Sequence, residues 1–173
     1  MAERPHGEDA ALVAVQSALA DRPGVLPGAR ALSHFGEHSI GWLVVAALGA
    51  LLRPTRRKAF LTAGVAAFGA HAAAVVIKRV VRRERPDHPA IAVNVGTPSR
   101  LSFPSAHATS TTAASILLGR ATGLPLPAIL VPPMALSRLV LGVHYPSDVL
   151  TGVAVGAAVA KAVTMVTERA EGV

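Results

Sequence analysis

One run of apolar residues is long enough to cross a lipid bilayer, and it limits the possible folds of this chain more than any other feature. In residues 59–81 only His71, Lys78 and Arg79 interrupt the apolar side chains. A helix needs about 20 such residues to span the hydrocarbon core of a membrane. Inside lipid every backbone amide must bond within the protein, which a helix achieves by itself. We therefore predict an all-α fold, an integral-membrane helical bundle.

Four further apolar segments predict a bundle of about five transmembrane helices. They cover residues 33–52, from near 105 to about 122, 126–141 and 147–167. The chain is 51% hydrophobic and only 16% charged, which is atypical of a soluble enzyme. The segment ending near 122 is rich in Ala, Ser and Thr, which favours close helix packing. Pro132 and Pro133 predict a kink in the next segment.

The first 30 residues have a different pattern. Residues 9–20 carry apolar side chains at helical spacing on one face, but this segment is too short to span a bilayer. It is either an interfacial helix or a solvated amphipathic helix. Acidic residues also stand where a signal peptide has basic ones. We therefore divide the chain into an N-terminal amphipathic or interfacial segment, 1–30, and a transmembrane domain, 31–173.

The net charge of +7 could indicate a nucleic-acid-binding protein. A soluble basic domain would not contain such long apolar runs, so we expect no nucleic acid partner. We assign the basic residues to loops that face anionic membrane lipids and to an anion site. The chain has no cysteine, which excludes disulfides and thiolate catalysis.

Three short polar clusters interrupt the apolar segments, and their side chains suit phosphate chemistry. The clusters contain Lys78, Arg85, Ser105, His107, Arg138, His144 and Asp148. Cations and a hydroxyl can bind a phosphate, one imidazole can attack it, and another can protonate the leaving group. Successive spans alternate in direction, so all three clusters should meet at one membrane face. The irregular connection 82–102 should cover that site.

These clusters resemble the motifs of the type 2 phosphatidic acid phosphatase (PAP2) superfamily, which also contains the vanadium haloperoxidases. The family pattern is K-x6-R-P, then P-S-x-H, then S-R-x5-H-x3-D, and this chain matches all three in order. It departs from the pattern at Ala106, where the family usually has Gly, but an Ala there still donates its backbone N–H. The resemblance covers about residues 33–167 and implies a PAP2-type phosphatase domain.

His144 and Asp148 are four residues apart, so they face each other across one helical turn. A carboxylate on one imidazole nitrogen leaves the other nitrogen free to attack. We expect His144 to be the nucleophile that forms a phosphohistidine, with Asp148 orienting it. His107 should act as general acid and then as general base. The alternative for each histidine is a helix-terminal residue with no catalytic task.

Lys78, Arg85 and Arg138 are the expected phosphate-binding cations, because Arg offers a planar fork and Lys a point charge. Ser105 adds a hydroxyl, and the backbone N–H groups near Ala106 add a helix N-terminus that favours anions. No carboxylate cluster suits a divalent metal, so we expect neither metal nor cofactor.

Several polar residues stay outside this predicted site. Arg79, Arg82 and Arg83 fit an anchoring role at the level of the lipid headgroups. His71 lies on nearly the same helical face as Lys78, and we favour a neutral histidine hydrogen-bonded between helices over a functional one. A further polar group carries no motif but could lie near the pocket mouth; it comprises His34, Glu37 and His38.

The resemblance implies a membrane lipid phosphate phosphatase that works without metal. The run Gly96–Ser110, the short length and the basic composition are most similar to the short actinobacterial members that dephosphorylate decaprenylphosphoryl-5-phosphoribose, a precursor of cell-wall arabinan. Polyprenyl diphosphate and phosphatidylglycerophosphate are alternative substrates. A haloperoxidase, or a non-catalytic lipid- or haem-binding protein, is an alternative of another class. The expected partners are the lipid phosphate substrate and membrane lipids. The sequence does not indicate the oligomeric state.

The basic residues next to the spans indicate how the protein is oriented in a bacterial plasma membrane. Arg53, Arg56, Arg57 and Lys58 favour a cytoplasmic loop opposite the site, which would make the site face outward. The site's own face is also basic, so the rule that cytoplasmic loops are rich in Lys and Arg gives conflicting indications.

We expect the lipid tail to leave sideways near Ala114, Ala135 and the Pro132-Pro133 kink.

Overall fold

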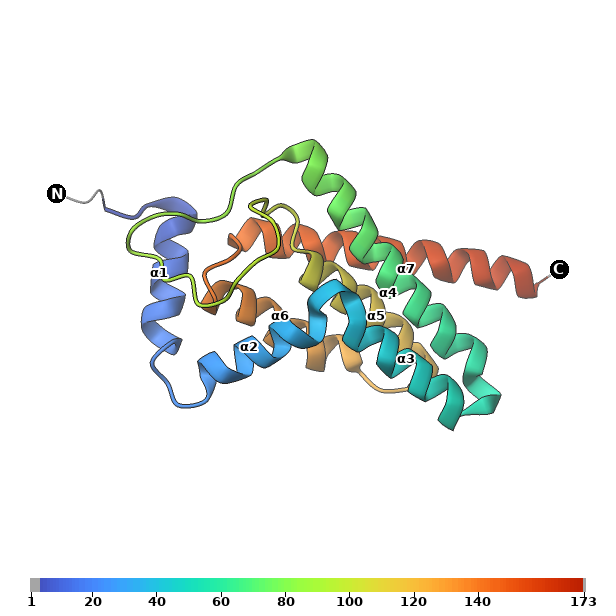
Figure 1. Ribbon diagram of the computed structural model, residues 1–173. Coiled ribbons are helices and arrows are strands. Elements are labelled where there is room, and N and C mark those ends of the chain that lie inside the picture. The colour runs from blue at the N-terminus through green and yellow to red at the C-terminus, as the bar shows by residue number, and fades with distance from the viewer. Residues whose placement is uncertain (1–3, 173) are drawn as a thin grey trace.

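Helices form almost all of the secondary structure in the computed structural model, which describes residues 4–172 (Figure 1). The α-helices are α1 (Gly7–Leu19), α2 (Val25–Gly36), α3 (Ile40–Leu52), α4 (Arg57–Val81), α5 (Ala106–Thr122), α6 (Leu126–Val140) and α7 (Pro146–Glu171). The 3-10 turn η1 (Glu37–Ser39) lies between α2 and α3, and η2 (Pro54–Arg56) lies between α3 and α4. Within residues 4–172 the β-structure is limited to one isolated bridge, between Glu84 and Leu101. The predicted all-α membrane bundle is confirmed.

Within residues 4–172, three helical stretches are long and apolar enough to cross a membrane, namely Val25–Leu52, Pro54–Val81 and Pro146–Ala170. The other two predicted spans are shorter, with 17 residues in α5 and 15 in α6. Helix α6 continues through Pro132 and Pro133. Helix α5 lies among α4, α6 and α7, so most of its side chains contact protein instead of lipid. This explains why α5 does not need the apolar composition of a lipid-facing span.

The hydroxyl groups of α5 are satisfied inside the bundle. Thr109 donates to the carbonyl of Ser105 at 2.8 Å, and Thr112 donates to that of Ala108 at 2.8 Å. The indole nitrogen of Trp42, from α3, donates to Thr111 at 3.2 Å. Hydroxyls that bond to their own helix allow a polar helix to be buried.

Two glycines bring α7 unusually close to α5. A Cβ on Gly152 would lie 2.7 Å from the carbonyl oxygen of Ser105, and a Cβ on Gly156 would meet the carbonyl oxygen of Thr109. Small residues at such a contact let two backbones approach. The contact fixes the N-terminus of α7 beside the N-terminus of α5, where two of the polar clusters lie.

The first predicted span differs from the structure. It begins at Val25 instead of near Ser33, because Pro27 sits in the first turn of α2, where a proline is tolerated. The helix then breaks at η1, where His38 and Ser39 have left-handed φ values of 49° and 61°. The predicted span over 33–52 therefore lies within a longer helical stretch, Val25–Leu52, but the prediction places its start too late and does not include the break at η1.

Helix α1 crosses one end of the bundle, next to the long connection between α4 and α5 (Figure 1). Its Leu12 is fully buried. The side-chain amide of Gln16 donates to the carbonyls of Ala92 and Val140 at 2.7 and 3.0 Å, and its oxygen accepts from the N–H of Ala92 at 3.0 Å. Helix α1 is therefore docked on protein along this face, and it holds part of the 82–105 connection in place.

Because α5 and α7 are in close contact, a larger side chain at a contact glycine should lower the stability of the protein, whereas one at an open position should not. We expect Gly156→Val to destabilise the protein by about 1–3 kcal/mol, because its side chain meets the α5 backbone. Gly69→Val is the matched control, since nothing lies within 4 Å of a Cβ at that position in α4. Thermal unfolding in detergent measures both. Equal midpoints for the two variants would contradict this packing.

Candidate active site

The three polar clusters converge at one end of the bundle, although they are far apart in the sequence. The C-terminal turn of α4, the N-terminus of α5, the C-terminus of α6 and the N-terminus of α7 meet there. A cavity of about 560 Å³ opens between them. The predicted site residues that line it are Lys78, Arg85, Ala106, His107, Arg138 and His144. Ser105 and Asp148 lie directly behind this lining and are fully buried.

The His144 imidazole is held between a guanidinium and a carboxylate. Nη1 of Arg85 lies 3.3 Å from Nε2 of His144. A guanidinium can only donate, so Nε2 carries the lone pair and the ring proton is on Nδ1. That Nδ1 faces Oδ2 of Asp148 at 3.5 Å, slightly longer than a hydrogen bond. The arrangement leaves the nitrogen nearer to the cations as the nucleophilic one.

Burial also keeps His144 uncharged. It lowers the pKa of His144 well below the usual value, and the three neighbouring cations lower it further. The side chain is only 3% exposed. A neutral imidazole at neutral pH is the form that can attack phosphorus or accept a proton.

Backbone carbonyls hold two of the cations in place. Nζ of Lys78 donates to the carbonyls of Ser102 and Leu101 at 2.6 and 3.2 Å. Nε of Arg85 donates to the carbonyl of Ser99 at 2.8 Å. Burial lowers the pKa of Arg85 to about 10, although Asp148 acts in the opposite direction. Both side chains are therefore oriented without a carboxylate directly attached to them, and they remain able to bind an anion.

Arg138 has hydrogen-bonding capacity left over. Its Nε and Nη1 donate to the hydroxyls of Ser137 and Ser33 at 3.2 and 3.1 Å. Its Nη2 is buried and has no hydrogen-bond partner among residues 4–172. A buried unpaired donor on a guanidinium is costly unless a ligand completes it. The free Nη2 therefore favours an oxyanion in the cavity.

His107 stands at the start of α5 and contacts α2. Its Nε2 donates to the carbonyl of Ser33 at 2.9 Å. Ser105, the N-cap of α5, accepts from the N–H of Ala108 at 3.4 Å, and its own N–H donates to the carbonyl of Asp148 at 2.9 Å. The second and third clusters are thus tied together by a backbone hydrogen bond. Ser33, which contacts both His107 and Arg138, carries no motif in the sequence.

Arg83 also lies at the site, contrary to the expectation that it anchors the protein among lipid headgroups. Its Nη1 donates to Oδ1 of Asp148 at 3.0 Å and to the hydroxyl of Ser147 at 2.6 Å. Its guanidinium stacks on the ring of Tyr145, 4.0 Å from the centroid. Asp148 is further fixed by the N–H of Tyr145, which donates to Oδ2 at 2.8 Å. Within a run of basic residues, the sequence offered no signal that singled out Arg83.

Glu8 from α1 completes this arrangement. It pairs with Nη2 of Arg83 at 2.6 Å and accepts from the backbone N–H of Ser147 at 2.8 Å. Burial raises the pKa of Glu8, but the hydrogen bonds from Arg83 and Ser147 outweigh that effect and lower it overall. A charged Glu8 therefore covers the N-terminus of α7, where the helix dipole favours an anion. Sequence reasoning gave Glu8 no role.

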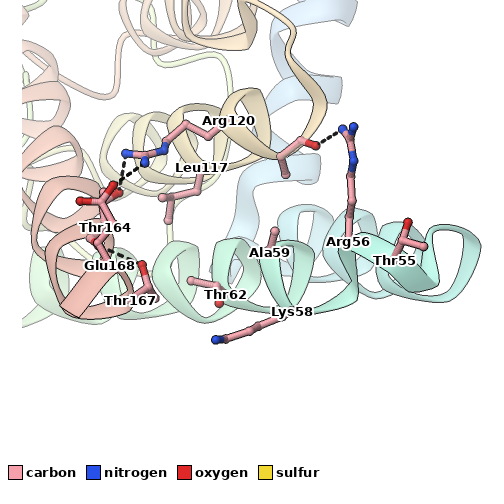
Figure 2. Close-up of a pocket in the computed structure, with 11 residues that line it drawn as sticks. Thr55, Arg56, Lys58, Ala59, Thr62, Leu117, Arg120, Thr164, Thr167 and Glu168 are labelled. Atoms are coloured by element: carbon pink, nitrogen blue, oxygen red, sulfur yellow. Dashed lines mark hydrogen bonds and ion pairs between the residues drawn. The ribbon is translucent and has the colours of Figure 1, made fainter. Parts of the chain in front are cut away.

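A second cavity, of about 430 Å³, lies away from these clusters (Figure 2). Its ionic groups are bonded within the protein. Arg120 of α5 donates to Thr164 and Glu168 of α7 at 3.2 and 2.7 Å, and Arg56 donates to the carbonyl of Ala121. None of the predicted site residues lines it. Phosphate chemistry is therefore assigned to the cavity that the three polar clusters line.

Comparison with known proteins agrees with these motifs. The model of the PAP2 superfamily matches residues 59–171. A protein of Mycolicibacterium smegmatis named decaprenylphosphoryl-5-phosphoribose phosphatase is 76% identical over 152 residues, covering 88% of this chain and 84% of its own length. A protein of the same name from Mycobacterium tuberculosis is 74% identical over 160 residues, covering 92% and 90%.

A solved structure supports the fold. The PAP2-type phosphatidylglycerolphosphate phosphatase from Bacillus subtilis superposes with a TM-score of 0.71 at 21% identity. The superposition covers 92% of this chain and 86% of that structure. At this identity the likeness establishes a shared transmembrane architecture.

The contacts of Arg83 predict that it positions Asp148. We expect Arg83→Gln to lower kcat about 10- to 100-fold, as loss of an orienting partner does at other sites, while KM changes little. Arg83 does not line the cavity, so it should not affect substrate binding directly. Arg82→Gln is the matched control, because its side chain is exposed. A change confined to KM, or an equal effect in both variants, would contradict this role.

Proposed function

The chain belongs to the PAP2 superfamily and is an integral-membrane phosphatase, and from that premise we propose that its substrate is decaprenylphosphoryl-5-phosphoribose. The observation that carries the proposal is the high identity to the two mycobacterial phosphatases of that name, over most of each chain. The same identity favours hydrolysis over the haloperoxidase and the non-catalytic lipid- or haem-binding alternatives.

The proposed reaction has two steps and starts with His144. Nε2 of His144 forms a bond to phosphorus while the bond from phosphorus to the C5 oxygen of the ribose breaks. His107 gives a proton to the departing alkoxide. Asp148 stabilises the imidazolium through Nδ1, as a carboxylate does in other nucleophile–base pairs. A phosphohistidine and a ribose hydroxyl result.

Water completes the proposed cycle. His107, now unprotonated, takes a proton from a water molecule that attacks the phosphohistidine. The bond between phosphorus and Nε2 breaks, and inorganic phosphate leaves with His144 restored. Negative charge on the equatorial oxygens is highest during each transfer, and fixed cations around them lower the barrier. We assign that task to Lys78, Arg85 and Arg138, with the hydroxyl of Ser105 and the backbone N–H groups near Ala106 as additional donors.

In this proposal side chains supply the positive charge. Residues 4–172 contain no group of three or more His, Asp or Glu side chains that could hold a metal ion. Asp148 already bonds to Arg83 and to the N–H of Tyr145. The free Nη2 of Arg138 and the carbonyl-oriented Lys78 support direct binding of the phosphate by protein groups.

A panel of purified lipid phosphates tests the proposed substrate. We expect the highest kcat/KM for decaprenylphosphoryl-5-phosphoribose, and lower values for undecaprenyl diphosphate and phosphatidylglycerophosphate. His144→Ala should abolish activity on every substrate, because no other group forms the phosphohistidine. Asp148→Asn should lower kcat by about 10⁴-fold at most, as loss of an orienting carboxylate does in a catalytic triad. Activity of the His144→Ala variant, or a preference for another headgroup, would contradict the proposal.

We further propose that the site faces outward across a bacterial plasma membrane. The loop at the opposite end of α4 carries Arg56, Arg57 and Lys58, which favours a cytoplasmic position. On the site's own face, Arg83 is paired with Glu8 and Asp148, so it adds little net charge to that side. This pairing weakens the argument that basic residues on the site's face place that face in the cytoplasm.

The absence of cysteine makes this orientation easy to measure. A cysteine introduced at Asp87, which is exposed on the site face, should react with a membrane-impermeant thiol reagent on intact cells. Thr55→Cys, at the other end of α4, should react only after the cells are permeabilised. The reverse pattern would place the site in the cytoplasm.

A further inference from the structure

The cavity extends beyond the groups that the proposed phosphate transfer uses. On one side it is lined by the phosphate-binding cations and His107, and on the other by residues of α2, η1 and α4. The second group comprises Ser33, His34, Glu37, His38, His71, Val75 and Arg79, and residues 95–99 and Leu101 of the 82–105 connection also line the cavity. These residues have no part in the reaction steps above. The volume of about 560 Å³ also exceeds what a single phosphate occupies.

His71 is a polar group at membrane depth with unused capacity. It lies two helical turns before Lys78 on α4, which places it about 10 Å further into the bilayer. Its Nδ1 is buried and has no hydrogen-bond partner in the part of the chain that the structure describes. The sequence-based interpretation of a histidine hydrogen-bonded between helices is therefore not supported at this nitrogen. Ionisable groups inside a membrane segment usually serve a function.

The ring of His38 lies next to the ring of His71, and both residues line the cavity. Their ring centroids are 5.7 Å apart, with the ring planes inclined at 57°. The two rings come from different elements, η1 and α4, so neither local helix geometry nor a shared motif brings them together. Two imidazoles at this separation can donate to and accept from one small polar group between them.

His38 lies in a segment with an uncommon backbone conformation. His38 and Ser39 both adopt left-handed conformations, with φ of 49° and 61°, which are uncommon for residues other than glycine. Ser39 is fully buried, and its hydroxyl donates to the carbonyl of Ala67 in α4 at 3.4 Å. Strained residues of this kind concentrate at binding sites, where the surrounding structure holds them in place. The break between α2 and α3 thus lets residues of η1 line the cavity.

We propose that His38 and His71 form a binding subsite for the hydroxyl-bearing group that joins the reacting phosphate to the lipid tail. This inference rests on the proposed function, and the group it implies is a sugar. A neutral imidazole offers one donor and one acceptor, which matches a hydroxyl. The phosphate lies among the cations near the membrane surface, whereas the tail needs hydrocarbon. A sugar held by the two histidines covers part of that depth, and the phosphodiester that links the sugar to the lipid tail follows it.

The location of this subsite changes the expected path of the tail. The histidine pair lies between α4 and the α2–η1 segment, away from the α5–α6 contact. Ala114, on the route expected from the sequence, is 1% exposed and packs in the hydrophobic core. In this proposal the tail leaves along α4, beside Val75 and His71, which both line the cavity.

Two soluble phosphates with the same type of leaving group test the proposal. Ribose 5-phosphate and n-butyl phosphate both release a primary alkoxide, but only the first carries further hydroxyls. We expect His71→Phe and His38→Phe each to lower the ratio of kcat/KM for ribose 5-phosphate to that for n-butyl phosphate. A decrease of about 10-fold corresponds to the loss of one or two hydrogen bonds. The same variants should lose a similar factor on decaprenylphosphoryl-5-phosphoribose.

Two further variants separate hydrogen bonding from packing. His71→Gln keeps a donor and an acceptor, so it should recover most of the ratio that His71→Phe loses. His6→Phe removes an exposed histidine outside the cavity and should leave the ratio unchanged. If the phenylalanine variants lost activity on both phosphates equally, or on neither, the subsite would be refuted. If the wild-type protein showed no preference for ribose-bearing phosphates, the proposed function itself would fall.

Discussion

Keeping three cations at the end of an apolar helical bundle is the constraint on which the rest of this structure depends. An isolated buried charge is expensive, and the usual remedy is a carboxylate partner. Here such partners would compete with the phosphate. Lys78 and Arg85 donate instead to backbone carbonyls of Ser99, Leu101 and Ser102. The irregular 82–105 connection therefore provides oxygen ligands that orient the cations and leave their positive charge in place.

In the proposed reaction Asp148 orients His144, and a second set of ionic contacts holds Asp148 in place. Arg83 bonds to Oδ1 of Asp148 while the N–H of Tyr145 bonds to Oδ2. Glu8 pairs with Arg83 on the far side. The 13-residue helix α1 is thus connected through two ion pairs to Asp148, the carboxylate beside the candidate nucleophile. Its docking, through Leu12 and Gln16, serves the same end of the bundle.

Helix α5 connects the membrane bundle to the site. Its hydroxyls bond to its own backbone, so it can be buried without apolar side chains. Glycines of α7 then let the two backbones come into contact, and the N–H of Ser105 bonds to the carbonyl of Asp148. This close contact sets the distance between the second and third motifs. The strained break at η1 lies on the other side, where the ring of His38 contacts that of His71.

The sequence by itself determined the membrane fold, the family and the three motifs. Those features depend on short-range information, since hydropathy sets the spans and a four-residue spacing sets the His144–Asp148 pair. Only the tertiary structure showed the contacts of Ser33, Arg83 and Glu8, and the contact between His38 and His71. Arg83 and Glu8 are separated by 75 residues, and Glu8 and Ser147 by 139. Contacts over such separations depend on how helices pack, and no local periodicity or spacing records them.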